Sequence, residues 1–471
     1  MKIFKKHSDL LVLLLIIIGF AIYKFPLLSI PYYWDEAWSY KPAIEEMVKN
    51  SSTLLPSSIT SETYKGHPLF FYFITSLWLK VFGNTIFISK LFALFISVSL
   101  MITTYFASKL LTNNKIISLF AVLLLAFQAI FIAQSTLVLP EMLLALLSLL
   151  SLLFYFKKKK ILYIVFGSLV LLTKETGIVL FASIFISNIL FNFNEIRNNF
   201  IKYIKDNYYL ILPVIPVVLF FILQKLFAGW LFYPEHIGFI EFGDAFYNKL
   251  ESFSGLLFIY QGRNLAFFIV IAISIYLISK RIKIKRYKEL SSFLIFIVLY
   301  ILFSSINFFS PRYILSLIPI FSIVVIMLID IALVNKILKY IAIIAIIASP
   351  LYYSLTHKFD YDHSIGYENV VEVQEKMIDY CEANNYYDKN IVTNFLMQVN
   401  MSDSIMGYLS SGRKFSKLQT QINDSTEYAI ISTNEPVESI NNYLQTNNCR
   451  QIIGFDKEQA WCGLFLIKPK N

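Results

Sequence analysis

The residues best suited to chemistry lie in a short aromatic and acidic stretch, which reads Pro31-Tyr-Tyr-Trp-Asp-Glu-Ala-Trp-Ser-Tyr40. Its two carboxylates are Asp35 and Glu36. Adjacent side chains point in different directions on a helix or a strand, so we expect only one of them to enter a given site. A carboxylate can serve as a general base towards a hydroxyl group. We assign this role to Asp35, with Glu36 orienting it or a metal ion; the alternative is a helix N-cap followed by a solvated loop charge.

Further polar residues interrupt apolar sequence at separate places along the chain. A charge at mid-bilayer depth costs about 2.5–3.5 kcal/mol on insertion scales, so such residues usually pair or line a cavity. Guanidinium groups also match the geometry of phosphate. Structural explanations remain for each residue, such as a helix start, mutual neutralisation with a neighbour, or contact with lipid headgroups. The candidates for binding a substrate or its phosphate are His67, Glu141, Lys174, Arg263 and Arg312.

The composition indicates what must position these residues. Of 471 residues, 57% are hydrophobic and 15% are charged, whereas soluble domains usually have roughly 25% charged residues. Apolar runs near the length of a membrane span recur from Leu10 to about Leu355, which predicts a polytopic α-helical membrane protein. The net charge of +10 comes largely from basic residues in short loops. This is the positive-inside pattern, so the charge indicates topology and not a nucleic-acid partner.

The same rule predicts the orientation. Lys2, Lys5 and Lys6 precede the first apolar run, which lacks a small-residue cleavage site and is interpreted as a retained span with a cytoplasmic N-terminus. Residues 26–84 then form an extracytoplasmic first loop, and 67–82 lie at the membrane interface, because five basic loops would otherwise face outward. The predicted spans, about eleven, are 10–25, 85–111, 116–134, 137–156, 161–173, 178–191, 208–228, 256–279, 290–309, 314–333 and 337–355.

After the transmembrane domain, residues 1–355, the character of the sequence changes. Residues 356–471 are more polar, and short apolar runs alternate with helical patterns, which predicts a small extracytoplasmic α/β domain. We expect helices at 370–382 and 437–445, and strands at 390–395, 428–432, 452–455 and 463–467. Cys449 and Cys462 can form a disulfide if this domain lies outside the cytoplasm. No cysteine or histidine spacing typical of a metal site is present.

In the predicted topology all seven candidate residues lie at one interface, the extracytoplasmic one. Cations there would stabilise a departing phosphate, and a carboxylate would take a proton from an acceptor hydroxyl. Glycosyl transfer needs both, because an oxocarbenium-like centre forms as the leaving group departs.

The chain resembles the GT-C membrane glycosyltransferases, in the branch of the protein O-mannosyltransferases and the lipid A aminoarabinose transferase. The motifs that resemble this family are Trp34-Asp35-Glu36-Ala37, His67-Pro68-Leu69 with a following segment that ends in Phe82-Gly83, Leu172-Thr173-Lys174, and Pro311-Arg312-Tyr313 followed by Ile318-Pro319. The resemblance covers about residues 10–335. Leu69 stands where the family has a second proline, and His67 where some relatives have lysine.

The resemblance implies a GT-C fold, a polyprenyl-phosphate-linked sugar as donor, and an inverting single displacement outside the cytoplasm. It implies that Asp35 is the catalytic carboxylate and that Lys174 and the outer arginines bind the donor phosphate. Some GT-C enzymes need a divalent metal, and the sequence leaves that requirement open.

The resulting hypothesis is a glycosyltransferase of the bacterial inner membrane, acting on a lipid, glycan or protein acceptor, with Glu36 and Glu141 supporting the site. The main alternative is a transporter or flippase of a lipid-linked or anionic solute, although no internal repeat of the kind common in transporters is present. A second alternative is a membrane-anchored binding protein whose C-terminal domain carries the function.

Overall fold

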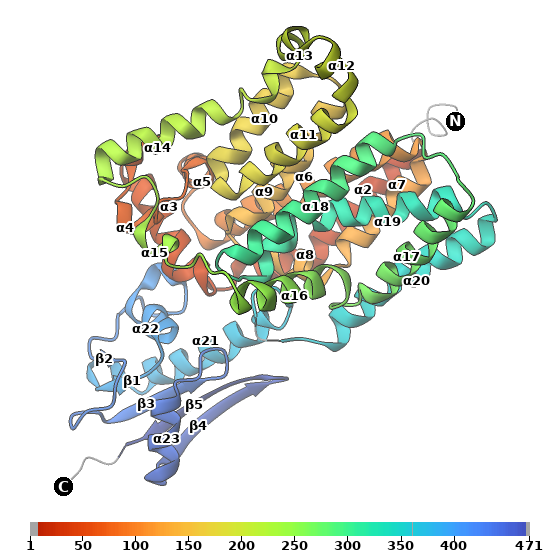
Figure 1. The fold of residues 1–471 in the computed structure, drawn as a ribbon. Helices are drawn as coiled ribbons and strands as arrows, with labels where there is room; N and C mark the ends of the chain where they lie inside the picture. Colours follow the sequence, from red (N-terminus) through yellow and green to blue (C-terminus); the bar gives the residue numbers. More distant parts are fainter. Residues whose placement is uncertain (1–7, 360, 468–471) are drawn as a thin grey trace.

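The computed structural model describes residues 8–359 and 361–467. They form a bundle of apolar helices with a small mixed domain packed at one end (Figure 1). Four helices are long and apolar enough to cross a membrane: α2 (Ser8–Lys24, continued by η1, Phe25–Ser29), α6 (Ile86–Thr112), α18 (Tyr287–Ile306) and α20 (Lys336–Thr356). A further pair, residues 200–210 and α14 (Val214–Ala228), is bent by 64° and can be one more span.

Shorter apolar helices fill the rest of the bundle: α5 (Phe70–Phe82), α7 (Lys115–Ala126), α9 (Pro140–Phe156), α10 (Lys160–Thr173), α11 (Ile178–Phe191), α17 (Asn264–Ser279) and α19 (Ile318–Ala332). Helices α9 and α19 lie at the centre, because nearly all of their side chains are buried. Helix α2 lies at the periphery and exposes many leucine and isoleucine side chains. The helical membrane architecture is thus confirmed, while the number of eleven spans stays a prediction.

Three of the predicted spans are wrong, because they are not continuous helices. Span 116–134 is broken between α7 and α8 (Ala129–Gln134). Span 256–279 is divided between α16 (Asp244–Phe258) and α17. Span 208–228 begins with the 3-10 turn η5 (Tyr208–Leu210), and α14 starts only after Pro213.

The turn between α16 and α17 is held close to α20. Gly262 has a positive φ of 76°, and a Cβ placed there would lie 2.6 Å from the carbonyl oxygen of Ser349 and 2.7 Å from the backbone of Pro350. Only glycine therefore fits this approach. The break contains Gln261, Gly262 and Arg263, a polar and glycine signal within the apolar run that the prediction of one continuous span did not use.

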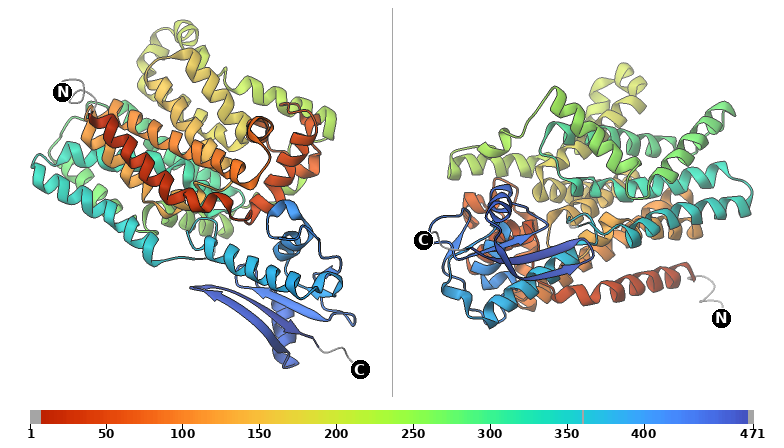
Figure 2. Two further views of the ribbon diagram at one scale, coloured as in Figure 1. Left: turned by 180° about the vertical axis from the view of Figure 1, so that it is seen from behind. Right: turned by 90° about the horizontal axis from the view of Figure 1, so that it is seen from below.

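The segment between α2 and α6 is a set of short helices and turns beside α14 and the C-terminal domain (Figures 1 and 2). It comprises η2 (Glu36–Tyr40, a π-helical turn), α3 (Lys41–Lys49), η3 (Pro56–Ser58), α4 (Ser61–Tyr64) and α5. The short α15 (Pro234–Ile237) follows α14 and precedes α16 in the chain. It lies close to this segment, since the rings of His236 and His67 are 5.0 Å apart. Helices α12 (Phe193–Asn198) and α13 (Phe200–Asn207) lie between α11 and α14 in the chain.

The C-terminal domain contains a five-stranded sheet in the order β2-β1-β3-β5-β4. Strand β1 (Ile391–Val392) runs parallel to β2 (Leu418–Gln419) and β3 (Tyr428–Ser432), whereas β5 (Ala460–Leu466) runs antiparallel to β3 and β4 (Arg450–Lys457). Helix α21 (Tyr367–Ala383) covers the face towards the bundle, and α23 (Glu438–Thr446) covers the other (Figure 1).

Most elements predicted for this domain are present, since helices 370–382 and 437–445 and the last three strands overlap α21, α23, β3, β4 and β5. The strand predicted at 390–395 is only partly correct. Its last residue begins α22 (Phe395–Ser402), because the Asn394 side chain accepts a hydrogen bond from the amide of Met397 at 2.8 Å and caps that helix. The sequence left open a disulfide between Cys449 and Cys462, and among the described residues these two sulfur atoms are not bonded to each other.

Ion pairs mark the two ends of the bundle. At the start of α2, Asp9 binds Lys109 at 3.4 Å and Lys115 at 2.9 Å. At its other end, Lys24 binds Glu368 of α21 at 3.3 Å. The basic loop that contains Lys109 and Lys115 therefore lies at the end away from the C-terminal domain.

Candidate functional site

Asp35 and Glu36 point into different surroundings. Asp35 accepts a hydrogen bond from the indole Nε1 of Trp38 at 2.8 Å and forms an ion pair with Arg312. Glu36 is fully buried, binds Lys90 at 3.2 Å, and accepts a hydrogen bond from the amide of Val138 at 2.7 Å. Asp35 is thus directed towards Arg312, whereas Glu36 connects the turn to α6 and to the start of α9.

Arg312 is the centre of a cluster of charged side chains. It lies in η6 (Pro311–Ser316), between α18 and α19, and its side chain is only 6% exposed. Its Nη2 contacts Asp35, its Nη1 lies 2.6 Å from Oδ2 of Asp362, and its Nε lies 3.4 Å from Oε1 of Glu141. One guanidinium therefore joins the first loop, the start of α9 and the segment that leads into the C-terminal domain.

Lys174 adds a second cation, which contacts the same oxygen of Glu141 as Arg312 does. Its Nζ lies 3.0 Å from Oε1 of Glu141 and 4.0 Å from the ring centroid of Tyr313. Its turn is fixed by close packing, because a Cβ on Gly177 would lie 2.5 Å from a methyl carbon of Val170. The other oxygen of Glu141, Oε2, is buried and has no hydrogen-bond partner among the residues that the structure describes.

Asp362 belongs to this cluster through its charge. Burial by itself raises the pKa of its carboxyl group, but Arg312, together with His363, lowers that pKa to about 2. Asp362 is therefore a carboxylate at neutral pH. The cluster, defined as Asp35, Glu141, Asp362, Lys174 and Arg312, contains three carboxylates and two cations.

His67 lies next to this cluster but outside it. Its Nδ1 lies 3.0 Å from Oε2 of Glu175, the neighbour of Lys174. Its ring also lies 5.0 Å from that of His236 in α15. Burial and the nearby His67 lower the pKa of His236 to about 4, so this ring is neutral at physiological pH.

Arg263 lies apart from the cluster, unlike the sequence-based expectation. It donates to the carbonyl oxygen of Leu256, to Oε1 of Gln128 at 2.9 Å and to Oε1 of Gln261 at 3.1 Å. Gln128 lies in the break between α7 and α8, and Leu256 belongs to the last turn of α16. All three acceptors are neutral and lie near helix ends. We therefore interpret the buried Arg263 as a residue that supports two helix ends, and we leave it out of the proposed site.

Sequence reasoning missed two charged residues near the first loop. Asp362 lies in a polar region, where a single aspartate has no distinguishing signal. Lys90 could have been found, because it is a cation inside the apolar run 85–111, far from Lys109 at the other end of that run, and a charge so placed requires a partner.

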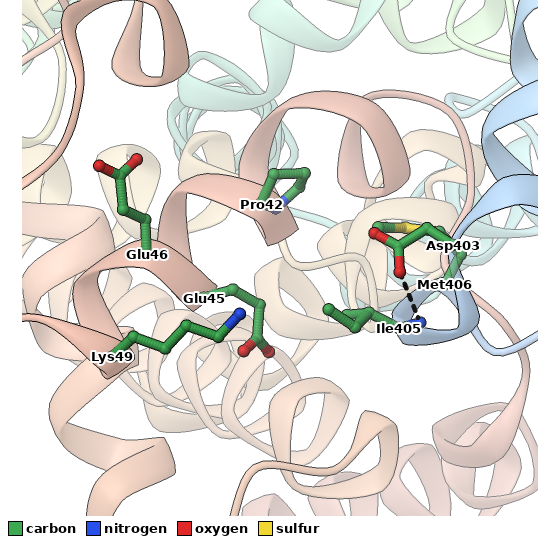
Figure 3. Close-up of a pocket in the computed structure, with 7 residues that line it drawn as sticks. All are labelled: Pro42, Glu45, Glu46, Lys49, Asp403, Ile405 and Met406. Atoms are coloured by element: carbon green, nitrogen blue, oxygen red, sulfur yellow. Dashed lines mark hydrogen bonds between the residues drawn. The ribbon is translucent and has the colours of Figure 1, made fainter. Parts of the chain in front are cut away.

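Two further features complete the description of the site region. A cavity of about 260 Å³ between α3 and the C-terminal domain is lined by Pro42, Glu45, Glu46, Lys49, Asp403, Ile405 and Met406 (Figure 3). Its carboxylates are engaged locally, Glu45 with Lys41, Glu46 with Thr60 and Asp403 with the amide of Ile405. Within residues 8–359 and 361–467 there is no group of three or more His, Cys, Asp or Glu side chains that could hold a metal ion.

Comparisons with known proteins agree with this architecture. Residues 66–221 match the family model of dolichyl-phosphate-mannose-protein mannosyltransferase. The crystal structure of ArnT from Cupriavidus metallidurans bound to undecaprenyl phosphate is similar, with a TM-score of 0.62 and 13% identity over 97% of this chain and 98% of that chain. The apo structure of the same protein gives a TM-score of 0.59 and 11% identity over 96% and 97% of the two chains. No curated protein sequence matches the chain.

The chain has the fold of the GT-C membrane glycosyltransferases, and the resemblance inferred from its short motifs is confirmed at the level of fold.

Proposed function

We propose that the protein transfers a sugar from a polyprenyl-phosphate-linked donor to a hydroxyl group of a lipid, glycan or protein acceptor. The observation that carries the proposal is the junction of Asp35, Arg312, Glu141 and Lys174, drawn from four separate parts of a GT-C fold. Such a junction combines a carboxylate that can accept a proton with cations that can bind phosphate.

In the proposed reaction the acceptor oxygen attacks the anomeric carbon of the donor sugar while its proton passes to Asp35. The bond between that carbon and the phosphate oxygen breaks, and polyprenyl phosphate leaves with one additional negative charge. Arg312 and Lys174 stabilise this charge. Because the attack comes from the face opposite the leaving group, the transfer inverts the anomeric configuration.

Glu141 has a further role in this proposal. Its Oε1 binds both cations, and its buried Oε2 is an acceptor without a donor within residues 8–359 and 361–467. A buried acceptor of this kind favours a ligand that brings a donor, because leaving it unpaired costs about 1–3 kcal/mol. A hydroxyl group of the donor sugar has this chemistry.

We further propose that the protein resides in the bacterial inner membrane, with a cytoplasmic N-terminus and an extracytoplasmic C-terminal domain. The positive-inside rule supports this orientation, because Lys109 and Lys115 lie at the end of the bundle away from that domain. The site then faces outward, where a flipped lipid-linked sugar is accessible.

The experiment is mass spectrometry of the lipids that co-purify with Asp35→Asn from the source cells. This variant keeps the cations but lacks the base, so it should retain a polyprenyl phosphate that carries one sugar. Asp388→Asn is the control, because it removes an exposed carboxylate of the C-terminal domain that contacts Arg413 and Ser416. Bulk phospholipid alone in all preparations would oppose the proposal and favour transport of another solute.

A further inference from the structure

The charges around Arg312 are unusual for a site that is to receive a phosphate. Three carboxylates surround two cations, so the cluster already has an excess of one negative charge. In the structure the guanidinium uses Nη1, Nη2 and Nε for Asp362, Asp35 and Glu141, respectively. An entering phosphate would add at least one more negative charge at a few ångströms, where like charges in a partly buried site repel each other strongly.

One carboxylate must therefore withdraw for the phosphate to bind well. Glu141 is fixed at the start of α9 and also binds Lys174. Asp35 is held by Trp38 within a short helical turn. Asp362 is different, because it lies in a non-helical segment, residues 361–366, between α20 and α21.

Residues 361–366 are held by the packing of the buried Ile365 and by polar contacts. The carbonyl oxygen of Asp362 accepts a hydrogen bond from Gln134 at 2.8 Å, and that of His363 accepts one from Gln261 at 3.4 Å. The carboxylate of Asp362 also lies 3.6 Å from Nδ1 of His363. The 2.6 Å contact with Arg312 is the ion pair that joins this segment to the bundle.

We propose that Asp362 and the donor phosphate compete for Arg312. Donor binding then displaces the Asp362 carboxylate and releases residues 361–366, and the position of the C-terminal domain is coupled to the occupancy of the site. The inference rests on the proposed function, since it takes a polyprenyl phosphate as the ligand.

The coupling has a direct path into the domain. Asp362 lies five residues before Tyr367, the first residue of α21, whose ring packs 5.4 Å from that of Tyr33 and whose hydroxyl lies 3.3 Å from that of Thr136. Tyr33 precedes the Asp35 turn. Release of Asp362 would therefore loosen α21 beside the turn that carries the proposed base.

The test is the affinity of the purified full chain in detergent for undecaprenyl phosphate, compared among the wild type, Asp362→Asn and Glu368→Gln. Asparagine keeps the shape of Asp362 and removes its competing charge. When a competing state that holds most of the protein is removed, the apparent Kd falls by the fraction previously unavailable, and we expect roughly a tenfold fall for Asp362→Asn. Glu368→Gln is the matched control, because it removes a different ion pair between α21 and the bundle, that with Lys24.

Each outcome decides between explanations. Tighter binding by Asp362→Asn alone supports competition. Equal or weaker binding overturns it, because a carboxylate that merely orients Arg312 would help the ligand. Equal tightening by both variants also overturns it, since loosening of the domain would then be the cause. If none of the three proteins binds the lipid, the proposed function fails and this inference fails with it.

A second measurement uses the wild type and does not depend on the folding of a variant. The amide of Ser364 donates a hydrogen bond to the carbonyl oxygen of Tyr361 at 2.9 Å. We expect hydrogen–deuterium exchange of the peptide that covers residues 361–366 to become faster when undecaprenyl phosphate is added at saturation. Unchanged or slower exchange while the lipid is bound would contradict the displacement of Asp362.

Discussion

Replacing Lys90 with methionine should destabilise the protein because it leaves the carboxylate of Glu36 buried without a counter-charge. Both side chains are fully buried, and Lys90 Nζ lies 3.2 and 3.3 Å from the two carboxylate oxygens. Removing one partner of a buried pair typically costs about 3–5 kcal/mol. The amides of Tyr33 and Val138 still donate to Glu36, so we expect a value near the lower limit.

A second variant carries both substitutions, Lys90→Met and Glu36→Gln. It removes both charges, and the remaining amide oxygen can accept from only one of the two backbone donors. One unsatisfied amide costs about 1–3 kcal/mol, so the double variant should be more stable than Lys90→Met alone. Lys376→Met is the control, because its partner Glu372 and the lysine are both exposed, and exposed pairs contribute about 0–1 kcal/mol.

The assay is thermal unfolding in one detergent, with the four midpoints compared. The expected order is wild type and Lys376→Met highest, the double variant next and Lys90→Met lowest. A midpoint of Lys90→Met equal to that of the wild type, or a double variant below the single one, would refute the view that the unpaired Glu36 charge dominates the cost.

Four further outcomes follow from the site. Asp35→Asn should reduce sugar transfer by about 10²–10⁴-fold, as for loss of a general base, measured as single-turnover transfer with the identified donor. Lys174→Met should weaken binding of undecaprenyl phosphate more than Lys174→Arg, because arginine keeps the charge. Arg263→Gln should lower the unfolding midpoint and leave the affinity for undecaprenyl phosphate unchanged in the folded fraction. The wild type should lose stability as the pH falls from about 6.5 towards 4, because the pKa of His236 is about 4 in the fold and the unfolded chain takes up the proton first; His236→Gln should reduce this slope in unfolding midpoints.

A different result would contradict each of these four predictions. Transfer at the wild-type rate by Asp35→Asn, with the lipid still bound, would assign the base to another group. Equal lipid affinity of the two Lys174 variants would remove that cation from the phosphate site. Weakened lipid binding by folded Arg263→Gln would return Arg263 to the site, and an unchanged pH slope in His236→Gln would place the responsible proton elsewhere.

The sequence predicted those elements whose boundaries are local. Helix α11 coincides with the predicted span 178–191, because a continuous apolar run is bounded by a polar turn on one side and by asparagines on the other. Strand β3 coincides with 428–432 for a similar reason. The break after Ala126 was not predictable in this way, because only one polar residue, Gln128, marks it in an apolar run, and the partners of its polar groups, Arg263 and Ser354, are distant in the sequence.

For the site, the sequence could predict which end of the bundle each residue occupies but not which residues touch. Asp35, Glu141, Lys174 and Arg312 meet, as their predicted common interface allowed. Arg263 shares that prediction and lies elsewhere, because the rotation of a helix about its axis decides its neighbours. Asp362 could not be singled out, because an aspartate in a polar segment is ordinary until the fold brings it within 2.6 Å of a buried guanidinium.

The charges of the cluster allow the two proposals to be considered together. With Asp362 bound to Arg312, three carboxylates and two cations leave one negative charge in excess. If a donor phosphodiester replaces Asp362, the excess is still one. During transfer the acceptor proton neutralises Asp35 while the leaving phosphate gains one negative charge, so the excess is one again. Exchange of Asp362 for the donor thus keeps the charge of a buried site constant through binding and reaction, whereas retention of Asp362 would raise the excess to two throughout, which low-dielectric surroundings disfavour.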